Sequence, residues 1–421
     1  MRRVVVTGLG VVAPGGVGTK EFWSLLTSGR TATRPITLFD PTPYRSRIAA
    51  EADFDPAEHH FTAGEAQRLD RAAQFALVSA REAIADSGLD REGDPLRTGV
   101  SLGSAAGCTT ALSTEYAVVS DCGSTWHVDH TKAVPHLLDY LMPSSLAAQV
   151  ALDSGAQGPV ALLSNGCTSG LDSIGHAAGL IREDSTDVMI AGGTEAPIAP
   201  ITVAGFDALK VTSRRNDEPQ TASRPFDLTR DGFVLGEGSA VLILEEFEHA
   251  RRRGARMYAE ISGFAQRSSA FHMTGLRPGG HDLALTIRAA LDQARIDPGD
   301  VDYINAHGAG TRQNDQYETE ALKRSFGPYA HRIPISSIKS MIGHALGAAG
   351  SLDLSASALA IEHGVVPPTA NLHVPDPACD LDYTPLIARE QRTDTVLGVG
   401  SGFGGFHSAV VLTRPRPAAA P

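Results

Sequence analysis

Apolar stretches of strand length alternate along the chain with amphipathic stretches of helix length. In the first half, a helix-like stretch at Arg71–Ser87, closed by Gly88, precedes an apolar run at 98–102, and the second half repeats this order at 283–295 and 301–304. Periods of 3.6 and 2 residues distinguish the two element types, and glycine is typical of helix ends. Other apolar runs that indicate strands cover residues 2–10, 160–163, 187–190, 240–244, 333–338 and 395–399.

This order of elements predicts parallel sheets with helices on both faces and with functional residues at the carboxyl ends of the strands. The repetition indicates two related halves, 1–252 and 253–414, followed by a disordered tail at 415–421. The helix-like segments that follow Cys167 and His344 are rich in small residues and poor in charge. Because glycines inside a helix are costly unless two backbones must approach closely, we expect both helices to be buried between two sheets.

The bulk composition narrows the possible partners and compartments. The 421 residues are 42% hydrophobic and 20% charged, as in an ordinary globular protein, and the formal net charge of −12 disfavours nucleic acid and anionic membranes as partners. Four widely spaced cysteines indicate neither a disulfide framework nor a zinc knuckle. With no leader ahead of the first strand and no apolar run long enough to span a bilayer, we expect a cytoplasmic protein.

Cys167 follows an apolar run that breaks at small residues, and a helix-like pattern begins directly after it. Unpaired N–H groups and the helix dipole at such a position are expected to lower the pKa of the thiol and to favour the nucleophilic thiolate. His307 and His344 lie in two glycine-containing segments, and the loop 400–405 could direct backbone N–H groups at an oxyanion. Each residue alone is more often structural, but together they favour thiol chemistry at a carbonyl group.

Charged residues near the two histidines leave several roles open. Lys339 follows an apolar run, where burial is costly without a partner, although a lysine at a strand end can also reach solvent. Asp315, Glu318 or Asp353 could pair with Lys339 or orient an imidazole, and Glu318 could equally be an exposed helix residue.

Other cofactor-dependent chemistries have little support in the sequence. No metal site is predicted, because the two histidines lie on separate segments without a third ligand at suitable spacing. The glycines at positions 8 and 10 lack the remainder of a dinucleotide fingerprint. A cysteine hydrolase, with water as the acyl acceptor, stays open.

The motifs around these residues resemble those of the β-ketoacyl synthases of the thiolase superfamily, over nearly the whole chain. They are Asn165-Gly-Cys167-Thr-Ser-Gly, Asn305-Ala-His307-Gly, Lys339-Ser-Met-Ile-Gly-His344 and the signature at 224–238. Segments 167–173, 310–315, 363–371 and 400–406 are most similar to the ketosynthase α subunit of bacterial type II polyketide synthases, which build aromatic polyketides. The resemblance implies a thiolase-like α/β fold, in which duplicated βαβαβαββ halves form a five-layer αβαβα sandwich.

The same resemblance implies a decarboxylative Claisen condensation. Cys167 would carry an acyl chain received from an acyl carrier protein, and malonyl carrier protein would then lose carbon dioxide. His307 and His344 would donate hydrogen bonds to the thioester oxygen as the enolate forms, and the backbone N–H groups of Cys167 and Phe403 would hold the later oxyanion. Lys339 would support the histidines electrostatically, and Phe403 would gate the acyl pocket.

Binding residues and partners are also implied by the resemblance. The substrate and the phosphopantetheine arm would contact Phe206, Thr311, Gly402 and Gly404, and the carrier protein would contact Lys210, Arg214 and Arg215. No cofactor is expected to be bound, since the carrier protein delivers the phosphopantetheine arm. The expected subunit partner is a homologous ketosynthase β, or chain-length, subunit in a heterodimer, with residues 139–143 at the interface.

The chain departs from the usual pattern at two positions. Ala309 replaces a hydroxyl residue, so one hydrogen bond to pantetheine is expected to be missing. Asp353 replaces a glutamate, and its shorter side chain calls the usual pairing with Lys339 into question.

Three related functions are alternatives. A thiolase would carry a second cysteine in the loop 400–405, which has none. A fatty-acid ketosynthase would use the same three residues, Cys167, His307 and His344, in a homodimer, and only the finer motifs argue against this function. A non-catalytic chain-length subunit would lack the nucleophile, whereas this chain has Cys167 and both histidines.

Overall fold

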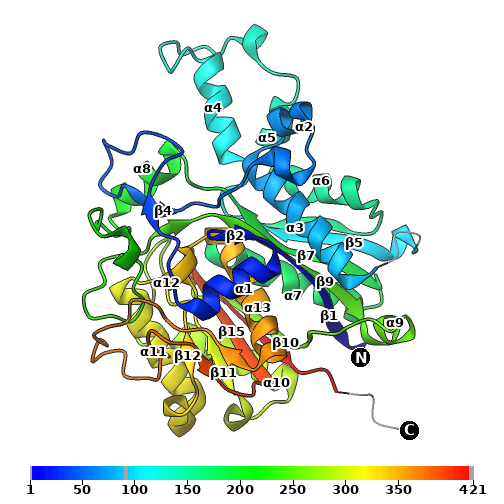
Figure 1. The fold of residues 1–421 in the computed structure, drawn as a ribbon, viewed down its shortest axis with the longest axis vertical. Coiled ribbons are helices and arrows are strands. Elements are labelled where there is room, and N and C mark those ends of the chain that lie inside the picture. Colours follow the sequence, from blue (N-terminus) through cyan, green and yellow to red (C-terminus); the bar gives the residue numbers. More distant parts are fainter. Residues whose placement is uncertain (1, 90–92, 417–421) are drawn as a thin grey trace.

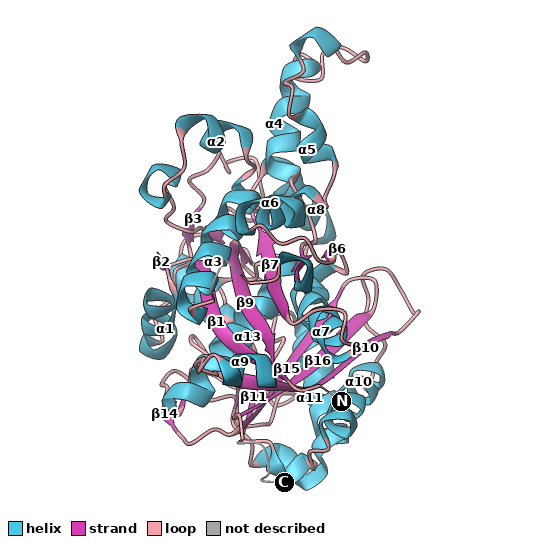
Figure 2. Ribbon diagram, turned by 90° about the vertical axis from the view of Figure 1, so that its right-hand side faces the viewer, coloured by secondary structure: helices cyan, strands magenta, loops and turns pink. Residues whose placement is uncertain are grey.

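The computed structural model describes residues 2–89 and 93–416, and its centre is a sheet built from two five-stranded halves (Figures 1 and 2). The first half has the strand order β1-β9-β7-β5-β6 and the second has the order β10-β16-β15-β11-β12. The bounds are β1 Val4–Ala13, β5 Thr98–Gly103, β6 Val160–Leu163, β7 Val188–Glu195, β9 Gly238–Glu246, β10 Ala259–Ser268, β11 Tyr303–Asn305, β12 Ile335–Ser336, β15 Thr395–Gly402 and β16 Phe406–Thr413. The duplication predicted from the sequence is confirmed strand by strand.

Strand direction differs from the prediction of parallel sheets. In each half, four strands are parallel, but β9 and β16 run antiparallel to both of their neighbours. For β16 the cause is local, since a tight turn at Phe403–Gly405 returns the chain beside β15, and a hairpin makes its strands antiparallel. A short antiparallel pairing of β1 with β10 joins the halves. The sheet continues from one half into the other, so the fold marks no boundary at residue 252, and the proposed division there stays a prediction.

Helices form three further layers around the two half-sheets (Figure 2). The outer helices α3 (Arg71–Ser87) and α6 (Ser145–Ser154) cover the first half, and α10 (His281–Ala294) and α11 (Arg312–Phe326) cover the second. The central layer consists of α7 (Ser169–Arg182) and α13 (Leu346–His363), which contact both half-sheets. The five-layer arrangement and the burial of both small-residue helices are therefore confirmed.

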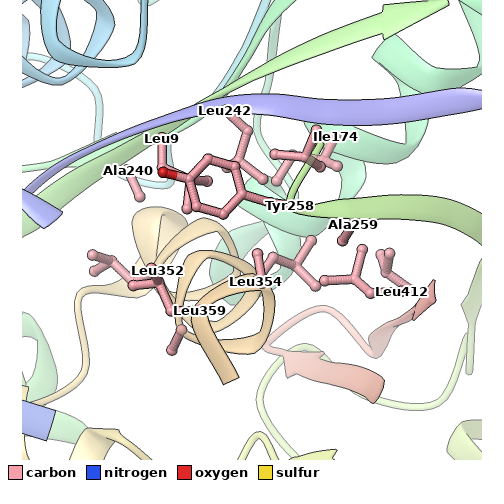
Figure 3. Close-up of a cluster of buried hydrophobic side chains, with 14 of the residues drawn as sticks. Leu9, Ile174, Ala240, Leu242, Tyr258, Ala259, Leu352, Leu354, Leu359 and Leu412 are labelled. Atoms are coloured by element: carbon pink, nitrogen blue, oxygen red, sulfur yellow. The ribbon is translucent and has the colours of Figure 1, made fainter. Parts of the chain in front are cut away.

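Glycine allows the two central helices to approach each other closely. A Cβ atom on Gly170 of α7 would lie 2.8 Å from the backbone nitrogen of Ser351, and one on Gly350 of α13 would lie 2.8 Å from that of Leu171. Apolar side chains from both halves converge around these helices (Figure 3), namely Leu9, Ile174, Leu242, Leu352 and Leu412. Burying such a side chain contributes about 1.5–3 kcal/mol, so the shared core binds the halves into one folding unit.

Most predicted elements occur, but several bounds differ. The helix at Arg71–Ser87 and the strand at Val160–Leu163 have the predicted bounds. The apolar run at 187–190 is the start of a longer strand, since β7 extends from Val188 through Gly192 to Glu195. Position 192 requires glycine, because a Cβ atom there would lie only 2.0 Å from the carbonyl oxygen of Ala240. Residues 417–421 of the predicted tail lie outside the described residues.

The remaining elements are short and lie around this frame. Helices α4 and α5 project from the first half (Figure 1). No helix in the described ranges is long and apolar enough to cross a membrane. The bounds are α1 Thr19–Ser28, α2 Ala63–Arg68, α4 Thr109–Val119, α5 Leu137–Leu141, α8 Pro200–Leu209, α9 Phe247–Arg252, α12 Lys339–Ile342, β2 Gly16–Val17, β3 Arg34–Pro35, β4 Ile48–Ala50, β8 Leu235–Gly236, β13 Val365–Val366 and β14 Arg389–Glu390.

Candidate active site

Cys167 lies in a single turn of 3-10 helix directly before α7, as the sequence predicted. Asp172, one turn into α7, holds this segment by accepting hydrogen bonds from Asn165 Nδ2 at 2.9 Å and from Thr168 Oγ1 at 2.8 Å. Gly166 adopts a φ of 59°, which turns the chain into the helix. The cysteine side chain is thereby directed into a pocket between the two halves.

The predicted lowering of the thiol pKa is wrong. Burial raises the pKa of Cys167 to about 12, against the opposing effects of the Lys339 ammonium and of the backbone N–H groups of Phe403 and Cys167. Desolvation disfavours a thiolate more strongly here than the helix start favours it. In the free protein Cys167 is therefore a neutral thiol, with two backbone N–H groups beside its sulfur.

His307 and His344 meet in the same pocket, with ring centroids 5.2 Å apart and planes at 80°. Burial and the nearby charge of Lys339 lower both pKa values, that of His344 to about 3 and that of His307 well below its usual range. Both imidazoles are consequently neutral at physiological pH, so each has one N–H donor. This protonation state suits hydrogen-bond donation to an oxygen that acquires negative charge.

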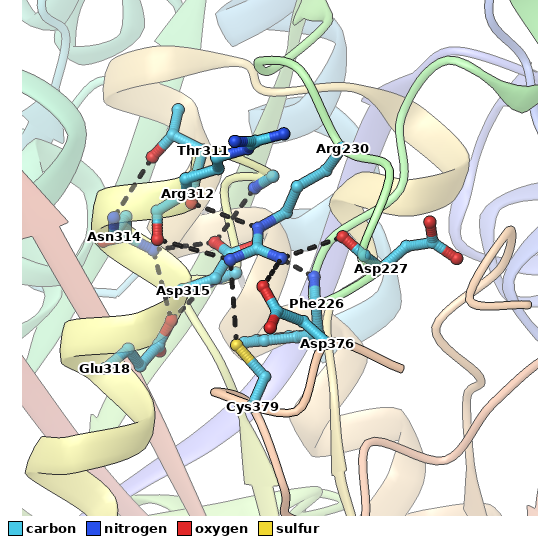
Figure 4. A network of polar contacts seen from close by, with 12 residues as sticks. Phe226, Asp227, Arg230, Thr311, Arg312, Asn314, Asp315, Glu318, Asp376 and Cys379 are labelled. Carbon is cyan, nitrogen blue, oxygen red and sulfur yellow. Dashed lines mark hydrogen bonds and ion pairs between the residues drawn. The ribbon is translucent and has the colours of Figure 1, made fainter. Parts of the chain in front are cut away.

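The loop that carries His307 is held from behind by α11. Glu318 is buried rather than exposed and accepts hydrogen bonds from the backbone nitrogens of His307 at 2.6 Å and Gly308 at 2.8 Å. Asp315 accepts one from Gly310 and pairs with the buried Arg230 at 3.0 Å (Figure 4). Burial raises the pKa of Glu318 to about 7. These carboxylates satisfy the loop's donors and fix its path.

The signature segment 224–238 holds His344. The His344 backbone nitrogen donates to the carbonyl oxygen of Val234 at 2.8 Å, and its carbonyl oxygen accepts from Gly236 at 3.0 Å. The Phe233 ring packs edge-on against the imidazole, with centroids 5.4 Å apart. Sequence reasoning recognised this signature but assigned it no role.

Lys339 and Asp353 form an ion pair, contrary to the expectation based on the shorter aspartate. Lys339 Nζ donates to Asp353 Oδ2 at 2.7 Å, and each side chain is no more than 3% exposed. Burial raises the pKa of Asp353 to about 6, against the lowering effect of Lys339. Lys339 begins α12 rather than ending a strand at the surface, which directs its side chain inward to α13.

The pocket encloses about 510 Å³, counting the part open to solvent, and most of the predicted binding residues line it. Phe206, Thr311, Gly402 and Phe403 are among them, and Thr311 also caps α11. A Cβ atom on Gly402 would lie 3.2 Å from the Cys167 nitrogen, so glycine at this position lets the end of β15 approach the turn that carries Cys167. Gly404 does not line the pocket; its nitrogen donates to the carbonyl oxygen of Met273.

The three predicted carrier-protein residues follow α8, which contributes Phe206 to the pocket. Lys210 ends this helix with a φ of 56° and is exposed, as is Arg214. Arg215 is partly engaged, since it donates to the carbonyl oxygen of Thr229 at 3.1 Å. Arg214 and Arg215 border a shallow surface depression together with Arg45.

Sequence reasoning missed Glu195, which is fully buried close to Cys167. Its one signal was an acidic residue at the end of an otherwise apolar strand. Within residues 2–89 and 93–416, no cluster of three or more His, Cys, Asp or Glu side chains could hold a metal ion. The assembled groups are a thiol, two neutral imidazoles, a buried ammonium and a pair of backbone donors, which together suit acyl transfer and stabilisation of an enolate or oxyanion.

Comparison with known proteins identifies relatives over the whole chain. Residues 1–250 match the β-ketoacyl synthase N-terminal domain, and residues 258–373 match the C-terminal domain. The tetracenomycin polyketide synthase ketoacyl synthase alpha subunit of Streptomyces glaucescens is 64% identical over 99% of this chain and 98% of its own length.

Two solved structures share the fold. A type II polyketide synthase acyl carrier protein in complex with its ketosynthase bound to the hexaketide, AntDE:AntF, matches with a TM-score of 0.92 and 39% identity over 98% of this chain and 100% of that one. The ishigamide ketosynthase/chain length factor matches with a TM-score of 0.90 and 32% identity over 99% of this chain and 100% of that one.

Proposed function

This chain belongs to the β-ketoacyl synthase family, and from that premise we propose that it is the condensing α subunit of a type II polyketide synthase. It is an acyl-transferring enzyme that elongates a poly-β-ketone by decarboxylative Claisen condensation. The high identity to a polyketide ketosynthase α subunit over nearly the full chain supports this specific function above fatty-acid elongation.

In the loading half-reaction, Cys167 attacks the thioester of an acyl carrier protein. The Cys167 sulfur bonds to the acyl carbon, the bond to the phosphopantetheine sulfur breaks, and the thiol proton leaves with the departing phosphopantetheine thiol. Because the thiol is neutral before attack, this transfer of the proton to the leaving group matters for the rate. Thr311 and Phe206, which line the pocket, are proposed to contact the arm and the acyl chain.

In the second half-reaction, a malonyl thioester loses carbon dioxide and becomes an enolate. His307 and His344 donate hydrogen bonds to the enolate oxygen, and the neutral state of both imidazoles supports this role. The enolate carbon attacks the acyl-cysteine carbonyl, the carbon–sulfur bond breaks, and the released Cys167 thiolate takes up one proton from solvent.

The tetrahedral oxyanion of this attack is proposed to bind the backbone N–H groups of Cys167 and Phe403. Both N–H groups lie at the sulfur, which supports the assignment. Loss of one such donor typically costs about 3–4 kcal/mol of transition-state stabilisation. The Gly402 and Gly404 backbone therefore contributes to catalysis through the position of Phe403.

The proposed partners are an acyl carrier protein, at Lys210, Arg214 and Arg215, and a homologous chain-length subunit. Several large apolar side chains are exposed in the stretch of sequence from the end of α4 to the start of β6, which supports a subunit interface in this stretch. The set comprises Trp126, Leu138, Leu141, Met142, Leu152 and Val160. In addition, β6 is the last strand of its half-sheet among the described residues and pairs there with β5 alone, so its outer edge could pair with a partner strand.

The observation that carries the proposal is the convergence of Cys167, His307 and His344 on one pocket, beside the Phe403 backbone. We would incubate the co-expressed chain and partner with malonyl carrier protein and analyse Cys167 by mass spectrometry. A growing acyl series on Cys167 is expected. Cys167→Ala should abolish loading, whereas Cys122→Ala, at an exposed cysteine, should not change it.

Retention of covalent acyl labelling in Cys167→Ala would overturn the nucleophile assignment. Size-exclusion chromatography tests the partner separately. A stable homodimer with full activity would contradict the proposed heterodimer.

A further inference from the structure

Glu195, at the carboxyl end of β7, is a buried carboxylate held entirely by neutral donors. Its Oε1 accepts hydrogen bonds from Ser104 Oγ at 2.9 Å and the Ala106 nitrogen at 3.0 Å, and its Oε2 accepts from the nitrogens of Ala105 at 2.6 Å and Gly347 at 2.9 Å. Four donors satisfy the carboxylate in place of a cation. Glu195 therefore joins the loop after β5 in the first half to the start of α13 in the second.

The bond to Gly347 bears directly on the segment of His344. Leu346, between these residues, has a φ of 41°, a left-handed conformation that is unfavourable for leucine and persists only when surrounding contacts enforce it. A Cβ atom on Gly347 would lie 2.6 Å from Glu195 Oε2 and 2.4 Å from the Ala105 nitrogen, so this contact also requires glycine. Leu346 and His344 both line the active-site pocket.

Burial raises the pKa of Glu195 to about 7, against its four hydrogen bonds. Burial also raises the pKa of Cys167 and of Cys108, and the Glu195 charge adds to both effects.

We propose that Glu195 is a positioning residue of the condensing site, which fixes the Leu346–Gly347 turn beside His344 through its hydrogen bond to the Gly347 nitrogen. This role rests on the proposed condensation, in which His344 is a donor.

Glu195→Gln tests this role, because it keeps the size of the side chain but removes its charge and half of its acceptor capacity. We would measure acyl loading of Cys167 by peptide-resolved mass spectrometry and, in the same preparation, the rate of condensation by product formation. Loading does not use His344 and should stay within about twofold of wild type, whereas a general loss of packing would lower both rates.

The condensation rate should fall about tenfold in this variant, with little change in the KM for carrier-bound substrate. The control is Glu245→Gln, at a buried glutamate near the carboxyl end of the neighbouring strand β9, which should change neither loading nor condensation. A condensation rate within about twofold of wild type in Glu195→Gln would overturn the proposal. A failure of the polyketide assignment would be seen separately, as absent acyl loading in the unmodified chain.

Should Glu195→Gln fail to fold, Glu195→Asp carries the test. The aspartate keeps the charge but is one methylene too short to reach Gly347, so acyl loading of Cys167 should match wild type while condensation falls about tenfold. Condensation at the wild-type rate in this variant would refute the positioning role.

Discussion

Replacing Lys339 by methionine should destabilise the protein by an amount that depends on pH. The substitution keeps the length of the side chain but leaves Asp353, which is buried at the active site, without the partner that its 2.7 Å contact supplies. Breaking a buried pair on one side costs about 3–5 kcal/mol when the remaining charge stays ionised. Asp353 can avoid part of this cost by taking up a proton.

The pKa of Asp353 is already raised to about 6 with Lys339 present, and it rises further without it. Between pH 6 and that higher value, the folded variant binds one proton that the unfolded chain does not. Its stability relative to wild type therefore falls as pH rises, by about 1.4 kcal/mol per pH unit. We expect a small loss at pH 5.5 and a loss of about 3–5 kcal/mol at pH 8.

Urea denaturation followed by circular dichroism at several pH values measures this loss. Adding Asp353→Leu to Lys339→Met removes the stranded carboxylate and should abolish the pH dependence. The surface control Lys323→Met breaks a partly exposed pair with Asp380 and should cost less than about 1 kcal/mol. Equal stability of Lys339→Met and wild type at pH 8, or a loss that does not vary with pH, would refute the reasoning.

Two further predictions concern the central helices and the imidazoles. Gly170→Ala forces a Cβ atom to within 2.8 Å of the Ser351 nitrogen and should lower the free energy of unfolding by about 1–3 kcal/mol. The control Gly179→Ala, on the same helix, meets no atom within 4 Å and should not destabilise the protein. Equal losses of stability in the two variants would contradict the close approach of the helices. His344 should show no titration between pH 5 and 8 in the NMR spectrum of histidine-labelled protein, because burial and the nearby charge of Lys339 lower its pKa to about 3. A His344 midpoint near 6.5 would contradict the neutral donor role.

The repeat of strands and helices could be predicted because each apolar run is bounded by glycine or polar residues. That pattern also located Cys167 and His307, which follow the ends of β6 and β11, and His344, which lies between α12 and α13 beyond the end of β12. Strand direction could not be predicted in the same way. It depends on whether a connection is a tight hairpin, as at 403–405, or a crossover through a helix.

Properties that depend on contacts between distant segments also could not be predicted from the sequence. The helix start at Cys167 is a local feature and was predicted, but the pKa of its thiol is set by burial among residues from both halves. Asp353 reaches Lys339 despite its short side chain, because Lys339 begins α12 and its side chain extends to Asp353 within the buried helix α13. Glu195 went unnoticed because its four donors come from two segments far away in the sequence.

The two halves hold equivalent loops by different means. The loop after β5 and the loop after β11 occupy equivalent places, and in each the nitrogens two and three residues beyond the strand donate to a buried glutamate. Glu195 comes from a strand and Glu318 from a helix, so two different elements supply the same acceptor. The first of these nitrogens belongs to Ala105 in one loop and to His307 in the other, so one backbone arrangement serves both a loop without a reactive side chain and a loop that carries one.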